Sequence, residues 1–254
     1  MNMNSQISYQ NNMKNTTWIL LLTLVLLSAC GGHNYVENPT DQFVKEYFSS
    51  KTFSVVLFDM DVNGTFFKSY KHKYKIIAEN SDGEVNQADT DWIEVSPKYF
   101  QANENNLGME LVSKGDDGKI NKSVGPAGFN SYVGNSRYGE WRSDGSGGSM
   151  WAFYGRYMFM SQMFGLMGRP AYYRHYNDYY SNYRYSRPYY GTAKSGGSRY
   201  GTNSAYTKKS RPNFYTRKSR KGWSNKGRTF NRYSSRGSSR SRSWGSSRGF
   251  GRGK

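Results

Sequence analysis

The stretch that decides the fold is Phe53-Ser-Val-Val-Leu-Phe-Asp-Met-Asp-Val62, followed by Asn63-Gly64 and then by Thr65-Phe-Phe-Lys-Ser-Tyr-Lys-His-Lys-Tyr-Lys-Ile-Ile77. Both long runs are rich in β-branched and aromatic residues, which favour strands. Asn-Gly between such runs is typical of a two-residue type I′ turn, because both turn positions need a positive φ. The pattern therefore predicts an antiparallel hairpin.

A two-residue turn at Asn63-Gly64 also fixes a register, in which Leu57 lies opposite Tyr70 and Val55 lies opposite His72. In the second run, lysines occupy every second position between 71 and 75. Because side chains alternate between the two faces of a strand, this spacing predicts one packed face and one hydrated face.

Further strands and a helix are predicted downstream of the hairpin. Trp92–Val95 has the composition of a strand, and Ser96 followed by proline favours a helix over about 97–106. Met109–Lys114 and Ile120–Val124 form a second expected hairpin. We therefore predict an α+β fold for residues 35–150, a small and mostly antiparallel sheet with one short helix.

The charge of the chain divides sharply near position 150. The 254 residues have a net charge of +18, yet residues 30–150 hold 12 basic and 17 acidic residues, whereas residues 151–254 hold 23 basic residues and one acidic residue. No Val, Ile, Leu or Met follows Met167. High charge without aliphatic side chains predicts that residues 169–254 are a disordered basic tail rich in Tyr, Arg, Gly and Ser.

An apolar run over residues 151–168 separates the expected domain from this tail. Its polar positions follow helical spacing, which predicts one apolar helix. Two interpretations stay open: the helix packs on the small domain, or it lies in the interface of a membrane, with its aromatic side chains at the level of the lipid headgroups.

Two motifs in the first hairpin concern metal binding. Asp59-Met-Asp-Val-Asn63-Gly64 has the oxygen spacing that opens a calcium loop, but the twelfth position is Tyr70, where a bidentate Glu is needed. The same stretch resembles the Asp-x-Asp of haloacid-dehalogenase-type phosphatases. A strand follows it, however, where that fold requires a crossover helix. We therefore predict no catalytic residue and no cofactor, with Asp59, Asp61 and Asn63 as the remaining metal candidates.

The amino-terminal segment has the features of an export signal. A 12-residue apolar run, Trp18–Ala29, ends in Leu27-Ser28-Ala29-Cys30, and it is too short to cross a bilayer as a helix. These residues resemble the lipobox of bacterial lipoprotein precursors. The resemblance implies that residues 1–29 are a signal peptide cleaved between Ala29 and Cys30.

Further expectations concern the lipid anchor, the start of translation and the membrane. Cys30 carries the lipid, and residues 30–34 link it to the domain. The compact basic segment after Met13 favours translation from that residue, and Gly31 favours the outer membrane over the inner membrane.

An export signal changes how the basic tail is interpreted. In the cytosol, arginine interleaved with aromatic residues indicates nucleic-acid binding. In a bacterial cell envelope, the same side chains meet lipopolysaccharide, acidic polysaccharide, peptidoglycan or extracellular DNA. The candidate anion-binding residues are Arg217, Lys218, Arg220, Lys221, Arg236, Arg240, Arg242, Arg248 and Arg252.

We therefore expect a non-enzymatic, lipid-anchored protein that attaches an acidic polymer to the membrane and organises the envelope. One alternative is an accessory or binding subunit of an envelope enzyme or transporter, with an envelope protein as its partner and the tail incidental. A second alternative is a metal-dependent hydrolase at Asp59 and Asp61. Contact between the acidic domain and the basic tail is a further expectation of the charge division.

Overall fold

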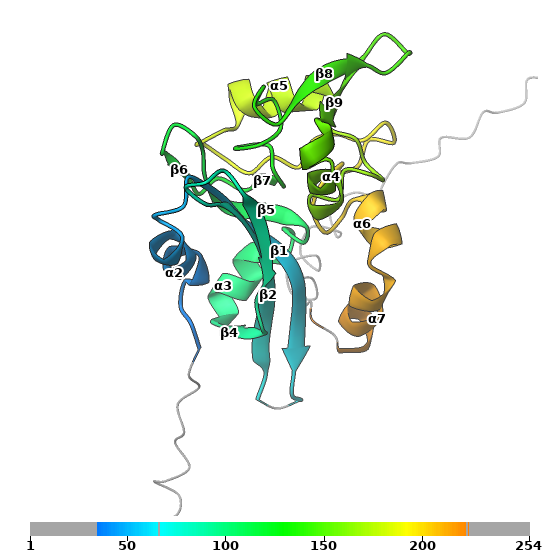
Figure 1. Ribbon diagram of the computed structural model, residues 1–254. Coiled ribbons are helices and arrows are strands. Elements are labelled where there is room, and N and C mark those ends of the chain that lie inside the picture. The colour runs from blue at the N-terminus through cyan, green and yellow to red at the C-terminus, as the bar shows by residue number, and fades with distance from the viewer. Residues whose placement is uncertain (1–34, 66, 222, 224–254) are drawn as a thin grey trace, which may run out of the picture.

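Strand β1 (Thr52–Asn63) is the central strand of a seven-stranded sheet in the computed structural model, which describes residues 35–65, 67–221 and 223 (Figure 1). It pairs antiparallel with β2 (Ser69–Glu79) on one side and with β5 (Met109–Lys114) on the other. The strand order is β3-β2-β1-β5-β6, with β4 paired to β2 and β7 paired to β5. Helices combine with this antiparallel sheet, so the predicted α+β class is confirmed.

The remaining elements follow in chain order. The other strands of the sheet are β3 (Val85–Asp89), β4 (Ile93–Val95), β6 (Ile120–Asn121) and β7 (Gly125–Pro126), and a separate hairpin is formed by β8 (Gly139–Ser143) and β9 (Ser149–Phe153). The helices are α2 (Pro39–Glu46), α3 (Pro97–Asn103), the short η1 (Gly155–Tyr157), α4 (Phe159–Met163), α5 (Tyr173–Asn182), α6 (Ala205–Ser210) and α7 (Pro212–Lys221).

The hairpin of β1 and β2 is present, but its predicted turn and register are wrong. Asn63 still pairs with Ser69, so the connection spans residues 64–68. Leu57 lies opposite Tyr74, because the register shifts between residues 57 and 59 and the connection is longer than two residues. With a two-residue turn, Ile76 and Ile77 would extend past Thr52, the first residue of β1, and would have no partner on that strand. The observed register instead buries both isoleucines against the sheet.

The elements predicted downstream are largely confirmed. Helix α3 begins at Pro97, and the Ser96 hydroxyl accepts a hydrogen bond from the Tyr99 amide at 3.1 Å. Strands β4 and β5 follow the expected ranges, and β6 is the paired part of the Ile120–Val124 run. Helix α2 was not predicted. It buries Phe43 at 6% exposure.

The sheet has a different core on each face. Val55 and Leu57 belong to one core, whereas their neighbour Val56 belongs to the other, as strand alternation requires. We call the first the aliphatic core, whose buried residues are Phe43, Phe53, Val55, Leu57, Met60, Val62, Tyr74, Ile76, Val95, Phe100, Leu107, Leu111, Val112 and Phe214. We call the second the tyrosine core, which includes Val56, Ile77, Met109, Phe129, Tyr132, Tyr138, Trp151, Tyr157, Met160, Phe164, Tyr179, Tyr189 and Tyr200.

The single apolar helix predicted for residues 151–168 is wrong. The segment starts inside β9, where Trp151 pairs with Trp141 of β8. It then passes through η1 and α4, and Gly165 takes a φ of +67°, which an α-helix does not allow. The apolar side chains Met160, Phe164 and Leu166 are buried in the tyrosine core. Within the described ranges 35–65, 67–221 and 223, no helix has both the length and the apolar character needed to cross a bilayer.

The prediction of a disordered tail is wrong for residues 169–221. Helices α5, α6 and α7 lie in this segment, and Tyr179, Tyr189, Tyr200 and Phe214 are each at most 2% exposed. Aromatic rings supply the buried surface that aliphatic side chains usually supply. Both cores combine residues from either side of position 150, so the expected domain boundary does not separate two packed units. Residues 224–254 lie outside the described part of the chain.

Candidate anion-binding site

The motif residues of β1 and the basic residues of α7 contact each other. Asp59, Asp61 and Asn63 alternate along β1, and α7 presents Arg217 and Lys221 to them one helical turn apart. The Arg217 Nη2 donates to both Asp59 carboxylate oxygens at 2.7 Å. The Lys221 Nζ donates to Asp61 at 2.8 Å and to the Asn63 Oδ1 at 2.7 Å. The expected contact between the acidic domain and the basic tail is therefore present.

This contact bears on both predicted sets of site residues. Arg217 and Lys221 neutralise the candidate metal ligands, and the same ion pairs remove two of the candidate anion-binding cations. Among the residues that the structure describes, no group of three or more His, Cys, Asp or Glu side chains is arranged to hold a metal ion.

The other predicted site residues are distributed as follows. Lys218 is half-buried and Arg220 is exposed. Ala29, Cys30, Arg236, Arg240, Arg242, Arg248 and Arg252 lie outside the described residues.

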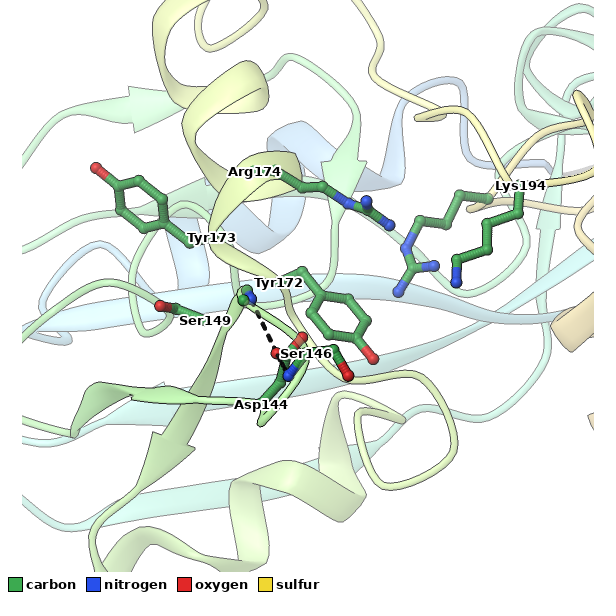
Figure 2. Close-up of a pocket in the computed structure, with 10 residues that line it drawn as sticks. Asp144, Ser146, Ser149, Tyr172, Tyr173, Arg174 and Lys194 are labelled. Atoms are coloured by element: carbon green, nitrogen blue, oxygen red, sulfur yellow. Dashed lines mark hydrogen bonds between the residues drawn. The ribbon is translucent and has the colours of Figure 1, made fainter.

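A hollow of about 610 Å³, which we call the hairpin hollow, lies between the turn of β8–β9 and the start of α5 (Figure 2). It is lined by Asp144, Ser146, Gly147, Gly148, Ser149, Tyr172, Tyr173, Arg174, Lys194 and Arg199. Three of these residues are cations and one is an acid. Figure 2 shows Arg174 and Lys194 projecting into the same space, with the ring of Tyr172 beside Asp144 and Ser146, whereas Tyr173 points away from them.

Separate elements hold the three cations around this space. The amide of Trp151 in β9 donates to the Ala171 carbonyl at 2.8 Å, which fixes the start of α5 and therefore Arg174. A tight turn closed by the bond from the Ala193 amide to the Gly197 carbonyl, also at 2.8 Å, presents Lys194. Arg199 follows this turn, and its Nη2 donates to the Pro170 carbonyl at 3.1 Å.

The three cations are available to an anion. The Arg199 guanidinium lies 5.3 Å from the centre of the Tyr172 ring, and the Arg174 guanidinium lies 5.7 Å from the same ring. None of Arg174, Lys194 and Arg199 forms a salt bridge with a carboxylate of the described residues. The hollow therefore has a surplus of two positive charges, and guanidinium groups recognise carboxylate and phosphate in a bidentate manner.

The acid of the hairpin hollow has a local structural role. The Asp144 Oδ1 accepts hydrogen bonds from the amides of Ser146 at 2.8 Å and Gly148 at 2.9 Å. These bonds lower the pKa of the Asp144 carboxyl and keep it ionised. Gly145 and Gly147 take φ values of +74° and +81°, which suit glycine in the turn that Asp144 closes. Residues 145–148 lie in the turn of the β8–β9 hairpin.

Two buried titratable groups elsewhere in the protein, Glu110 and His72, lie on strands of the sheet. Burial raises the pKa of Glu110 to about 7, although Ser54 and the Gly128 amide donate hydrogen bonds to it. Burial lowers the pKa of His72 to about 3, and its Nδ1 lies 3.0 Å from the Tyr74 hydroxyl. Neither group lines the hairpin hollow, so we assign both to the packing of the sheet.

Reasoning from sequence alone missed Arg174, Lys194 and Arg199. They come from a stretch that resembles a uniform mixture of tyrosine, arginine and glycine, in which no spacing marks one cation above another. Comparison of the chain with models of protein families, with curated proteins and with solved structures finds no match.

Proposed function

We propose that this chain is a non-enzymatic, lipid-anchored protein of the bacterial cell envelope that binds acidic polymers through its basic C-terminal half. The observation that carries the binding part is the hairpin hollow, where Arg174, Lys194 and Arg199 surround one space without a paired carboxylate. The lipobox at Cys30 supports the location. Both parts together make the protein a tether between a membrane and an acidic polymer.

The arrangement of the fold suits such a tether. Five positions separate Cys30 from Tyr35, where the described chain begins, and a segment of that length spans at most about 18 Å. A lipid on Cys30 therefore holds the folded part close to the bilayer. Figure 1 places β8, β9 and α5 at the end of the molecule opposite to the start of the described chain. In that orientation the hairpin hollow faces away from the membrane.

The binding part is tested with the mature chain, residues 30–254, carrying Cys30→Ser so that it stays soluble. We expect it to bind a polyuronate and not uncharged dextran. Because binding releases counterions from the polymer, the affinity should fall by about 10-fold or more between about 50 and 200 mM salt. An affinity that does not change with salt contradicts the electrostatic mechanism.

The anchoring part is tested by fractionating cells that produce the full-length chain with or without Cys30→Ala. We expect the parent chain in the membrane fraction and the variant outside it, because two or more acyl chains are needed for stable attachment. Recovery of the parent chain from the cytosol would reject the envelope assignment.

A further inference from the structure

The hairpin hollow is the first of three hollows that share lining residues. A second hollow, of about 330 Å³, shares Tyr172 and Arg199 with it. A third hollow, of about 440 Å³, shares Arg169 and Tyr206 with the second. Resting on the proposed function, we infer that the three hollows form one continuous groove that binds a linear acidic polysaccharide along its length. We call it the cationic groove.

Positive charge continues through all three hollows. The lining cations are Lys194, Arg174, Arg199, Arg169, Arg211 and Lys75. Lys75 is the one among them that pairs with a described carboxylate, Asp89, at 3.3 Å. The described residues that line the second and third hollows include no acid. A repeating negative charge therefore meets a cation in each part of the cationic groove.

Arg169 is the centre of the cationic groove. Its guanidinium lies between two rings, 4.5 Å from the centre of Tyr200 and 4.9 Å from the centre of Tyr206. The Nη1 donates to the Arg199 carbonyl at 2.8 Å, whereas the buried Nε has no partner among the described residues. Burial lowers the pKa of Arg169 to about 10, so the group stays charged at neutral pH. A buried charge without a counter-ion is costly, and an anion in the groove removes that cost.

A second unpartnered donor lies beside Arg169. The Arg199 Nε is also buried without a partner among the described residues, and its guanidinium lies 5.7 Å from the centre of the Tyr200 ring. Arg199 lines the first and second hollows, and Arg169 lines the second and third. The two arginines with an unpartnered Nε therefore lie at the two junctions of the cationic groove.

The lining favours a polysaccharide over a nucleic acid. Single-stranded nucleic acids need open aromatic faces on which bases stack. In the cationic groove, arginine already lies over the lining rings of Tyr172 and Tyr206. Hydroxyl and amide side chains are also part of the lining, for example Ser149 and Gln162, and they match the hydroxyl groups of a sugar. Apolar side chains such as Phe58 and Met163 line part of the third hollow. Asp144 also lines the hairpin hollow, and its carboxylate can accept a hydrogen bond from a sugar hydroxyl group.

The test uses the mature chain, residues 30–254 with Cys30→Ser, and variants at both ends of the groove. Lys194→Gln alters the hairpin hollow, and Arg211→Gln alters the third hollow. Lys98→Gln is the matched control, because Lys98 is exposed on α3 and lines none of the three hollows. The probes are a long polyuronate, a diuronate, dextran and single-stranded oligodeoxythymidylate. Thermal unfolding of each variant identifies any loss of fold. Because Lys194 is exposed, we expect its replacement to leave the fold intact.

We expect each end variant to weaken binding of the long polyuronate by about 5-fold to 10-fold, and the control to leave it unchanged. The long chain should also bind more tightly than the diuronate, because it contacts both ends. If the long polyuronate binds equally well to all variants, the groove assignment is wrong while the proposed function stands. If no acidic polymer binds the parent chain, the proposed function itself is wrong. If the oligodeoxythymidylate binds more tightly than the polyuronate and both end variants weaken it, the polymer class is wrong.

Discussion

The aliphatic core and the tyrosine core lie on opposite faces of the same sheet and are stabilised by different chemistry. The aliphatic core consists mostly of side chains without polar atoms, such as Val55, Leu57 and Ile76. In the tyrosine core, each buried tyrosine ring also carries a hydroxyl group that has to be satisfied. The Tyr132 hydroxyl lies 3.2 Å from that of Thr52, and the Tyr179 hydroxyl accepts from Asn121 at 3.0 Å. Hydrogen bonds between distant segments thus contribute to the second face, whereas the first face depends mainly on shape and apolar area.

The largest expected effect comes from removing the aromatic residues of the C-terminal half. A chain that ends at Gly168 lacks Tyr179, Tyr189, Tyr200 and Phe214, and therefore leaves cavities in both cores. We expect it to lose its cooperative unfolding transition in denaturant. A chain that ends at Trp223 keeps all these side chains and should unfold cooperatively. Equal behaviour of the two truncated chains would contradict the shared cores.

Single substitutions compare the two cores directly. We expect Leu57→Ala and Tyr179→Ala each to lower the free energy of unfolding by about 3–5 kcal/mol, because each removes a fully buried side chain. Tyr179→Phe should cost only about 1 kcal/mol, the value of one hydrogen bond. Denaturant titrations measure all three changes. A small loss for Tyr179→Ala would mean that the tyrosine core does not contribute to stability.

The two faces should also respond to pH in opposite directions. Glu110 has a pKa of about 7 in the folded protein against 4.5 ordinarily, so between these values the unfolded chain loses the proton while the folded chain keeps it. The free energy of unfolding therefore falls by roughly 3 kcal/mol as pH rises through this interval. His72 has a pKa of about 3 against 6.5, so the unfolded chain binds the proton first and stability falls as pH drops below 6.5.

Two variants separate these pH effects. We expect Glu110→Gln to remove the fall in the free energy of unfolding toward neutral pH. We expect His72→Gln to remove the fall in the free energy of unfolding toward acid pH. Unfolding titrations of the parent and both variants between pH 4.5 and pH 7 measure the differences. Parallel profiles for all three proteins would show that neither group changes its proton affinity on folding.

The smallest expected effect concerns the contact between α7 and β1. A double-mutant cycle on Arg217→Gln and Asp59→Asn should give a coupling of about 1 kcal/mol, which falls as salt rises, because both side chains are partly shielded from water. The Lys122–Asp41 pair is the matched control. Its side chains are 60% and 45% exposed, and its coupling should be close to zero. Equal coupling energies in the two cycles would show that partial burial does not strengthen the Arg217–Asp59 ion pair.

Local patterns were sufficient to predict several elements in the first half of the fold. The Ser96-Pro97 helix start and the Met109–Lys114 strand were found because capping and alternation act over a few neighbouring residues. The register of β1 and β2 was missed, because it depends on which partners bury Ile76 and Ile77 rather than on the Asn-Gly pair. Burial across a sheet is a tertiary effect, and it outweighs a turn preference.

The candidate site was harder to predict than the fold. Arg217 and Lys221 were identified as cations, but their partners Asp59 and Asp61 lie about 160 residues earlier in the chain, and no local rule connects such positions. Tyr200 and Phe214 were assigned to disorder because the segment lacks aliphatic residues. That rule treats tyrosine as a polar residue, whereas here its ring is buried and its hydroxyl is bonded in most cases.

Phe214 has a consequence for the order of events in the cell. This ring, contributed by α7, fills the aliphatic core of strands made more than a hundred residues earlier. While the ribosome is still adding the tyrosine-rich segment, Phe214 is absent and the aliphatic core on those strands is incompletely packed. The last described helix therefore completes the aliphatic core, and the sheet reaches its full packing only after this helix has been made.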